Sequence, residues 1–414
     1  MLVSSFVVAL FLAQAPLAPW AEGGTSQGED LRISIATFGP GDDLFSWWGH
    51  GALMVEDVKA NHGRLYNYGM FGFGPDSAWQ FVQGRLWFWV GEDSIGGTFS
   101  LYKSLNRDVR VQELNLLPEQ RLAIARALAK VVLPENRNYL YHHYNDNCST
   151  RPRDLIDQAF GGQLSKATAD KPARMSLRLH ARRFSAVNPF MAWLLDYVQN
   201  DELDRPITVR DEAYLPDELE KQLAALTVTR PDGSTVPAVA KSWTYFKSTR
   251  PAPLEVPPNP VGWLFLIGGT IGFAALGLAH FWHRGAKWAR VLLGLEVALY
   301  GLFFGVLGWF LYLTGLFTDH SVAHRNENWF LANPLGLALL PFGIMLAFGS
   351  VKAKARIFWV LGLLAATTVL GIVVKVLPPF NQDNWTAIAV MFPATGGLFG
   401  AFLIERVLSA RKTT

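Results

Sequence analysis

Five apolar segments in the C-terminal part of the chain constrain its fold more than any other feature. They lie at 261–282, 291–317, 330–349, 357–377 and 386–404. Each holds about 20 residues or more, which is enough for a helix to cross a hydrocarbon core about 30 Å thick. Prolines interrupt the third and fifth segments, and spanning helices tolerate proline where neighbours satisfy the freed carbonyl. The sequence therefore predicts an all-α domain of five transmembrane helices over 261–404 and a cytoplasmic tail at 405–414.

The charges between these segments predict the orientation of the domain in the membrane. Lys and Arg are concentrated in alternate connections, at 283–290, 350–356 and 405–414. The other two connections, 318–329 and 378–385, hold only Arg325 between them. Because basic loops stay on the cytoplasmic side, residues 1–260 are expected on the opposite side of the membrane.

The N-terminus agrees with export of the region that follows it. The run M-L-V-S-S-F-V-V-A-L-F-L-A-Q-A is short, apolar and ends in an A-x-A pattern. This pattern is typical of a secretory signal. We predict a signal peptide or a retained N-terminal anchor over residues 1–21.

Residues 30–210 have the pattern of a soluble α+β domain. Alternating apolar residues predict strands at 31–38, 49–57, 64–71 and 109–116, and amphipathic spacing predicts helices at 118–131 and about 148–160. Asn61, His62 and Gly63 predict a hairpin between the second and third strands. Residues 211–260 form a domain tail and a connector, which is proline-rich at 247–260 and expected to be stiff.

Cys148 is the only cysteine in the 414 residues, and it lies in the polar stretch N-D-N-C-S-T-R-P-R-D. A single cysteine cannot form an intramolecular disulfide. The alternatives are an inert thiol, an intermolecular link or a nucleophile. At the N-terminus of the predicted helix, the helix dipole and Arg151 are expected to lower the thiol pKa. The backbone amides there are expected to hold the oxyanion of an acyl-transfer intermediate.

A thiol nucleophile needs a base, and nine histidines compete for that role. His50 begins a predicted strand between Gly49 and Gly51, which let another chain approach closely. His142 and His143 lie nearer to the cysteine in sequence, in a Y-H-H-Y stretch, where a structural role is as plausible. The choice between them stays open on this argument.

The connection at 318–333 gathers polar residues at one edge of the predicted membrane domain. With Pro334, which follows it, its sequence is T-D-H-S-V-A-H-R-N-E-N-W-F-L-A-N-P, and it includes His320, Asn326 and Asn328. It predicts either a solvated turn or a polar site at the bilayer surface. The H-x-x-x-H spacing has no evident third ligand, so no metal is expected. The aromatic run at 81–90 fits either an interfacial contact or a core element.

The order of three motifs resembles that of the permuted papain-like superfamily. W-G-H-G-A-L is followed by Y-N-Y-G-M-F and, much later, by Y-N-D-N-C-S-T-R-P-R-D-L-I. NlpC-type hydrolases and lecithin:retinol acyltransferase belong to that group. The segment T-D-H-S-V-A-H-R-N-E-N-W-F-L-A-N-P is similar to the H…N-x-N…N-P segment in the membrane domain of Lnb-type bacterial lipoprotein N-acyltransferases. The chain therefore resembles the Lnb type over most of residues 33–404.

The resemblance implies site residues. It implies a permuted papain-like fold, with Cys148 as nucleophile and His50 as general base. Asn67, on the strand expected to pair with the His50 strand, is the first choice for a third, orienting residue, and Glu56 and Tyr68 are alternatives. The chain departs from the expected pattern at Gly51, where a small polar residue is expected, and at the two preceding tryptophans.

The resemblance also implies an activity. An acyl chain would move from a membrane phospholipid, through a cysteine thioester, to the N-terminal amine of a diacylglyceryl-cysteine lipoprotein. No cofactor is implied, and the enzyme would lie in the bacterial inner membrane with its catalytic domain on the periplasmic side. Arg151, His320, Asn326 and Asn328 are the predicted substrate-binding residues.

Two other classes of function remain open on the sequence. One is an exported cysteine hydrolase, either a cell-wall peptidase or amidase or a phospholipase A. The other is a non-catalytic membrane scaffold. The formal net charge is +3 and no basic block is typical of a nucleic-acid site, so nucleic acid is not an expected partner.

Overall fold

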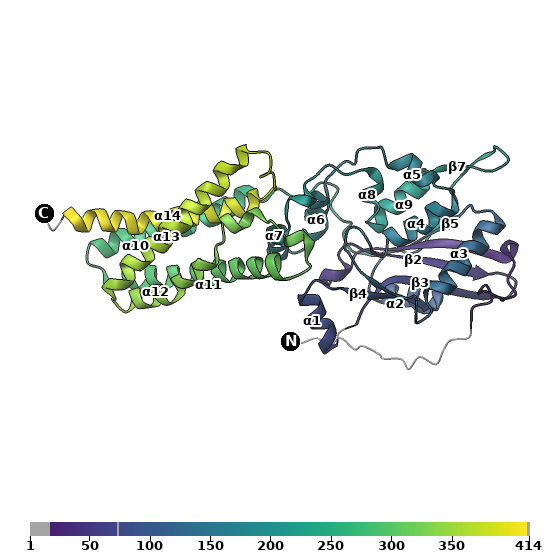
Figure 1. The fold of residues 1–414 in the computed structure, drawn as a ribbon, viewed down its shortest axis with the longest axis horizontal. Helices are drawn as coiled ribbons and strands as arrows, with labels where there is room; N and C mark the ends of the chain where they lie inside the picture. Colours follow the sequence, from purple (N-terminus) through teal and green to yellow (C-terminus); the bar gives the residue numbers. More distant parts are fainter. Residues whose placement is uncertain (1–16, 73, 412–414) are drawn as a thin grey trace. The chain divides into compact units, whose positions relative to one another are not determined.

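The computed structural model describes residues 17–72 and 74–411, and the chain divides into two compact units (Figure 1). The first unit comprises the residues up to Gly72 together with Trp87–Lys171 and Val209–Arg250. The second comprises the described residues 74–86, together with Pro172–Thr208 and the chain from Pro251 onward. Residues 1–16 of the predicted signal peptide or anchor, 1–21, lie outside the described residues. The predicted domain boundaries at 210 and 260 stay predictions.

A seven-stranded antiparallel sheet organises the first unit, in the order β6-β4-β3-β2-β1-β5-β9. The strands are β1 (Leu31–Phe38), β2 (His50–Asp57), β3 (His62–Met70), β4 (Trp87–Asp93), β5 (Val109–Leu114), β6 (Asn138–Leu140) and β9 (Val239–Phe246). A separate hairpin joins β7 (Thr227–Thr229) and β8 (Thr235–Pro237). The four predicted strands are present, and the predicted hairpin joins β2 to β3.

Helices cover both faces of this sheet. They are α2 (Ile95–Ser104), α3 (Pro118–Val131), α4 (Thr150–Ala159), α5 (Gln163–Thr168), α8 (Val209–Glu212) and α9 (Pro216–Ala225). Because side chains alternate along a strand, Ile33 of β1 packs in one core with α3, α4 and α9, whereas Phe38 packs in a second core with Phe99 of α2. The unit is a mixed domain of helices and antiparallel strands. Its permuted papain-like topology stays a prediction.

The second unit consists of helices. They are α1 (Pro75–Val82), α6 (Leu177–Ser185), α7 (Pro189–Val198), α10 (Val261–His283), α11 (Lys287–Phe317), α12 (Leu339–Ala347), α13 (Val351–Val373) and α14 (Trp385–Arg411). The second unit also has short 3₁₀ segments, at Asp201–Leu203, Ser321–Ala323, Glu327–Phe330, Pro334–Ala338 and Val374–Val376. Two further 3₁₀ segments, Gly28–Asp30 and Leu44–Ser46, belong to the first unit.

Five helical segments are long and apolar enough to cross a membrane. They are Val261–His283, Lys287–Phe317, Glu327–Ala347, Val351–Val376 and Trp385–Ser409. The five apolar segments predicted from the sequence therefore form helices of spanning length. The third starts with two 3₁₀ turns, and Pro334 begins the second of these. Gly268 and Gly272 let α10 approach α14 closely, because a Cβ at either would meet backbone atoms of α14 at 2.2 and 2.5 Å.

Candidate active site

His50 and Asn67 face one another on neighbouring strands. His50 is the first residue of β2, and Asn67 of β3 is paired with Ala52 in the antiparallel register. The His50 Nε2 atom lies 3.0 Å from Asn67 Oδ1, and Asn67 Nδ2 donates to Asp93 Oδ2 at 2.8 Å. A line of hydrogen bonds therefore crosses β2, β3 and the end of β4.

This line selects one tautomer of the histidine. A carboxylate only accepts hydrogen bonds, so Asp93 takes the NH₂ group of Asn67 and turns the amide oxygen toward the imidazole. That oxygen also only accepts, so His50 carries its proton on Nε2 and its Nδ1 lone pair remains available as a base. The partner of His50 is thus Asn67, the first choice from the sequence, and not Glu56 or Tyr68.

Cys148 lies against the strands that carry His50 and Asn67. It directly precedes Ser149, the N-cap of α4. A Cβ at Gly51 would lie 3.0 Å from the Cys148 carbonyl oxygen, and a Cβ at Gly69 would lie 3.7 Å from the Cys148 Cβ. Gly69 has φ +86° at an irregularity in the pairing of β3 with β4. The departure from the expected pattern at Gly51 therefore has a steric reason, since any side chain there would press on Cys148.

The helix amides expected to hold an oxyanion are already bonded. The side-chain oxygen of Asn147 accepts hydrogen bonds from the amides of Ser149 and Thr150, at 2.7 and 2.9 Å. This corrects the expectation that the first turn of α4 supplies the oxyanion donors. The amides that hydrogen-bond the Cys148 thiol and lower its pKa are those of Gly51 and of Cys148 itself. They are the better candidates for that role.

The thiol and the imidazole are both neutral near pH 7 in this arrangement. Burial raises the pKa of the Cys148 thiol above its usual value, and the amide contacts only partly offset this. Burial also lowers the pKa of His50 to about 4, against the opposing effect of its bond to Asn67. The expectation of a thiol pKa lowered by the helix end is therefore wrong for the resting site, because desolvation exceeds the favourable terms.

Arg151 does not face the thiol as a free cation. Its guanidinium makes a two-pronged ion pair with Asp146 and lies 3.8 Å from the ring centre of Tyr139. The charge that lowers the pKa of Cys148 belongs instead to Arg107. Arg107 is 41 residues from the cysteine in the chain, so its effect on the thiol could not be predicted from the sequence and arises only through the fold.

The two histidines nearest in sequence to the cysteine have structural contacts. His142 Nδ1 accepts hydrogen bonds from the amides of Tyr144 and Asn145. His143 packs edge-on against Trp48, with ring centres 4.7 Å apart, and burial lowers its pKa to about 4. In the part of the chain that the structure describes, no group of three or more His, Cys, Asp or Glu residues is arranged to hold a metal ion.

Asp93 is a member of the site that sequence reasoning missed. It ends β4, directly after the aromatic run that was interpreted only as an interfacial contact or a core element. The structure divides that run between the end of α1 and the start of β4, with Phe81, Val82 and Trp87 exposed. The sequence did contain a signal for Asp93. Strand β4 ends in G-E-D, and it pairs with β3, which carries the polar residue Asn67.

The predicted substrate-binding residues of the 318–333 connection belong to the second unit, whereas Cys148 belongs to the first. Asn326 and Asn328 are buried, and both side chains donate to the Tyr197 carbonyl, at 3.2 and 2.7 Å. His320 Nε2 lies 2.9 Å from the Phe81 carbonyl oxygen. The side chains of His320, Asn326 and Asn328 therefore make hydrogen bonds within the second unit. Their role in binding a lipid headgroup stays a prediction.

A buried ionic network surrounds Asp196 of α7 in the second unit. Arg178, with no exposed side-chain surface, bonds to both Asp196 and Asp204. Arg182 pairs with Asp196 and with Asp383, which precedes α14. Each partner of a buried ion pair needs the other, since removing one leaves an uncompensated charge. This network ties α6 and α7 to the membrane-spanning helices.

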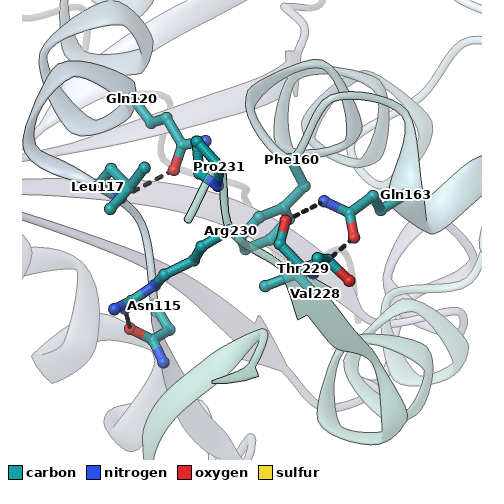
Figure 2. A pocket seen from close by; sticks show the side chains of 9 residues that line it. All are labelled: Asn115, Leu117, Gln120, Phe160, Gln163, Val228, Thr229, Arg230 and Pro231. Atoms are coloured by element: carbon teal, nitrogen blue, oxygen red, sulfur yellow. Dashed lines mark hydrogen bonds between the residues drawn. The ribbon is translucent and has the colours of Figure 1, made fainter. Parts of the chain in front are cut away.

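Figure 2 shows a pocket whose lining includes Phe160, the C-cap residue of α4, whereas Cys148 precedes the other end of that helix. The pocket is lined by Asn115, Leu117, Gln120, Phe160, Gln163, Val228, Thr229, Arg230 and Pro231. Gln163 exchanges two hydrogen bonds with the backbone of Thr229, and Arg230 donates to Asn115. These polar groups are bonded to one another, and the helix separates the pocket from the cysteine.

Fold and site together indicate a class: a multi-pass membrane protein whose α/β domain places Cys148 against the strands that carry the hydrogen-bonded pair His50 and Asn67. Residues 20–183 match the family model described as the Lnb N-terminal periplasmic domain. This match, with the five apolar helices that follow, fits a Lnb-type protein and indicates a Lnb-like lipoprotein-modifying enzyme. Comparison with curated proteins and with solved structures gave no significant match.

Proposed function

We propose that the chain is a lipoprotein N-acyltransferase that uses Cys148 as a covalent acyl carrier. The observation that carries the proposal is the hydrogen-bonded line Asp93–Asn67–His50, which leaves His50 Nδ1 as the nitrogen that can act as a base. The residue after His50, Gly51, places its amide against the thiol of Cys148, the only cysteine of the chain. The order of a histidine strand before a cysteine helix also supports the permuted papain-like interpretation. The Lnb-type match supports lipoproteins as the acceptor class.

In the first half-reaction, the Cys148 sulfur attacks the carbonyl carbon of an acyl ester in a phospholipid. His50 Nδ1 accepts the thiol proton as the S–C bond forms and the carbonyl electrons move onto the oxygen. The amides of Gly51 and Cys148 stabilise that oxyanion. The C–O ester bond then breaks, His50 returns the proton to the leaving alkoxide, and a lysophospholipid departs from a Cys148 thioester.

In the second half-reaction, the free amine of a diacylglyceryl-cysteine attacks the thioester carbonyl. Such an amine has a pKa of about 8 and is partly neutral at pH 7, so modest help from a base suffices. His50 accepts the amine proton and returns it to the departing Cys148 thiolate. The products are an N-acylated lipoprotein and the original thiol.

Burial of the pair favours transfer over hydrolysis. A thioester is also open to attack by water, and a desolvated site reduces that side reaction. The burial that raises the pKa of Cys148 and lowers that of His50 is the same desolvation. The five apolar helices support a lipid substrate, because one anchor would serve an enzyme acting on a soluble polymer. In this proposal the protein lies in the inner membrane with its first unit in the periplasm.

The test is mass spectrometry of a synthetic diacylglyceryl-cysteine peptide incubated with phospholipid vesicles and the full chain. Wild type is compared with Cys148→Ala, and with Cys148→Ser as a near-isosteric control. We expect the wild-type reaction to add one acyl chain to the peptide as an N-terminal amide and to release lysophospholipid. Both variants should lose this product, and an acyl adduct of the protein should map to Cys148.

Other outcomes would assign the protein to another class. Lysophospholipid and free fatty acid without acylated peptide would make it a phospholipase A. Turnover of cell-wall peptides, but not of lipid, would make it a cysteine hydrolase. An unchanged product yield with Cys148→Ala would refute the role of the cysteine.

A further inference from the structure

Arg107 is a buried cation without a contact ion pair among the described residues, and the carboxylate that acts on it electrostatically is that of Asp43. Its side chain is 7% exposed, and its Nε donates to the Gly39 carbonyl at 2.7 Å. Its Nη2 is buried and has no hydrogen-bond partner among the described residues, and no carboxylate of the described chain forms an ion pair with it. A charge held out of water in this way is costly unless an anion forms beside it.

The position of Arg107 links it to the catalytic histidine. The guanidinium carbon lies 4.6 Å from the centre of the Tyr102 ring. The Tyr102 ring is parallel to the His50 ring within 5°, at 6.2 Å, and Phe38 stacks on Tyr102 at 3.8 Å. The Tyr102 carbonyl also accepts a hydrogen bond from the Arg107 amide. The cation is therefore fixed to the same aromatic stack that holds the base.

The electrostatic effect of Arg107 falls on both members of the pair. Its charge lowers the pKa of Cys148, and it also lowers the pKa of His50. The other cation near the cysteine in sequence, Arg151, is paired with Asp146. Besides Arg107, the titratable groups coupled to the Cys148 charge are the hydroxyls of Tyr102, Tyr139 and Tyr141, whose pKa values burial raises, so they stay neutral. The charged groups that act on Arg107 itself are Asp43, which stabilises the cation, and Arg250, which opposes it.

We propose that Arg107 is the fixed cation that compensates the negative charge formed at Cys148. This charge lies on sulfur once the thiol proton has moved to His50, and on the carbonyl oxygen once the S–C bond has formed. Arg107 thus acts as an electrostatic positioning residue for the nucleophile. The inference rests on Cys148 as the nucleophile, but not on the identity of the acyl acceptor.

Alkylation of the single cysteine provides a direct test. The full chain in detergent micelles is treated with iodoacetamide at a series of pH values, and the modified fraction is followed by intact-protein mass spectrometry, with Cys148→Ala as the blank. Arg107→Met removes the charge and keeps much of the volume, and Arg107→Lys keeps the charge. Arg32→Gln is the matched control, because Arg32 is exposed at the far end of β1.

We expect Arg107→Met to raise the alkaline midpoint of Cys148 alkylation by about one pH unit, a tenfold loss of thiolate below that midpoint. The acid limb of the alkylation–pH profile, which reports the protonation of His50, should also move to higher pH. The reason is that the Arg107 charge lowers the pKa of His50 as well as that of Cys148. Arg107→Lys should fall between wild type and Arg107→Met, and Arg32→Gln should match wild type. The midpoint is the readout, since a more basic thiolate is also intrinsically more nucleophilic.

Thermal unfolding separates this role from a structural one. Because the charge has no ion-pair partner, Arg107→Met should keep the melting temperature within a few degrees of wild type. An unchanged alkylation midpoint in a folded Arg107→Met protein would overturn the proposal. So would a midpoint in folded Arg107→Lys equal to that of Arg107→Met, because the retained charge would then have no effect. Neither readout needs lipid or peptide, so failure of the acyltransferase assay would leave this result interpretable.

Discussion

Removing Asn67 and Asp93 singly and together tests whether the hydrogen-bonded line acts as one unit. Asn67 is 5% exposed and accepts from His50, whereas Asp93 is exposed and contacts only the amide of Asn67 within this line. If Asp93 acts through Asn67, its effect should vanish once Asn67 is gone. The perturbation is therefore a double-mutant cycle of Asn67→Ala and Asp93→Ala.

The magnitudes follow from burial. Asn67→Ala leaves a buried imidazole N–H without its acceptor, which costs about 1–3 kcal/mol and lowers kcat/KM by about 5- to 150-fold. Asp93→Ala removes a solvent-screened bond of about 0.5–1.5 kcal/mol, so a loss of about 2- to 10-fold is expected. The double variant should match Asn67→Ala within about twofold.

The assay is initial-rate release of lysophospholipid, with iodoacetamide alkylation of Cys148 as a check on the intact thiol. Melting temperatures show whether each variant is folded. Multiplicative losses in the double variant would show that Asp93 acts independently of Asn67. Wild-type kcat/KM in a folded Asn67→Ala protein would refute the assignment of the third residue.

Three further results are expected. Burial lowers the pKa of His50 to about 4, and the reaction needs the neutral imidazole. Acylation of Cys148 should therefore persist to about pH 5 and be lost as the pH falls through 4. A rate of lysophospholipid release that falls with a midpoint near pH 6.5 would contradict this. Gly51→Ala should press on the Cys148 carbonyl and lower kcat/KM by up to about tenfold, whereas Gly96→Ala, with open space around its Cβ, should stay within twofold. Arg178→Ala removes an ion-pair partner from both Asp196 and Asp204, and it should destabilise the second unit by about 3–5 kcal/mol in denaturant or thermal unfolding. A melting temperature equal to that of wild type would exclude a stabilising network.

Much of the fold could be predicted because it depends on local patterns. Alternation predicted β1, β2 and β3, and the chemistry of the 61–63 turn predicted the hairpin. The helix predicted near 148–160 is α4, which starts two residues after Cys148. Strand β9 was not predicted, because residues 239–246 gain strand structure by pairing with β5, a partner about 130 residues earlier in the chain.

The contact between His50 and Asn67 was predictable from the sequence, whereas the electrostatics of the candidate site were not. Pairing of the second and third strands brings Asn67 within reach of His50, so neighbouring strands alone suggested that contact. The sign of the thiol pKa shift was wrong, because desolvation depends on every element packed around Cys148. Arg151 was credited with a charge that Asp146 neutralises, and Asp93 and Arg107 were missed.

The sequence by itself determined the features that depend on runs and periods of residues. These are the five apolar helices, the antiparallel hairpin and the single cysteine ahead of a helix. The tertiary structure alone decided which cations are held in contact ion pairs. Asp146 cancels Arg151 while Arg107 stays unpaired beside the aromatic stack of His50. The physical reason is that burial and Coulomb energy depend on distance through space, which the linear order of residues does not contain.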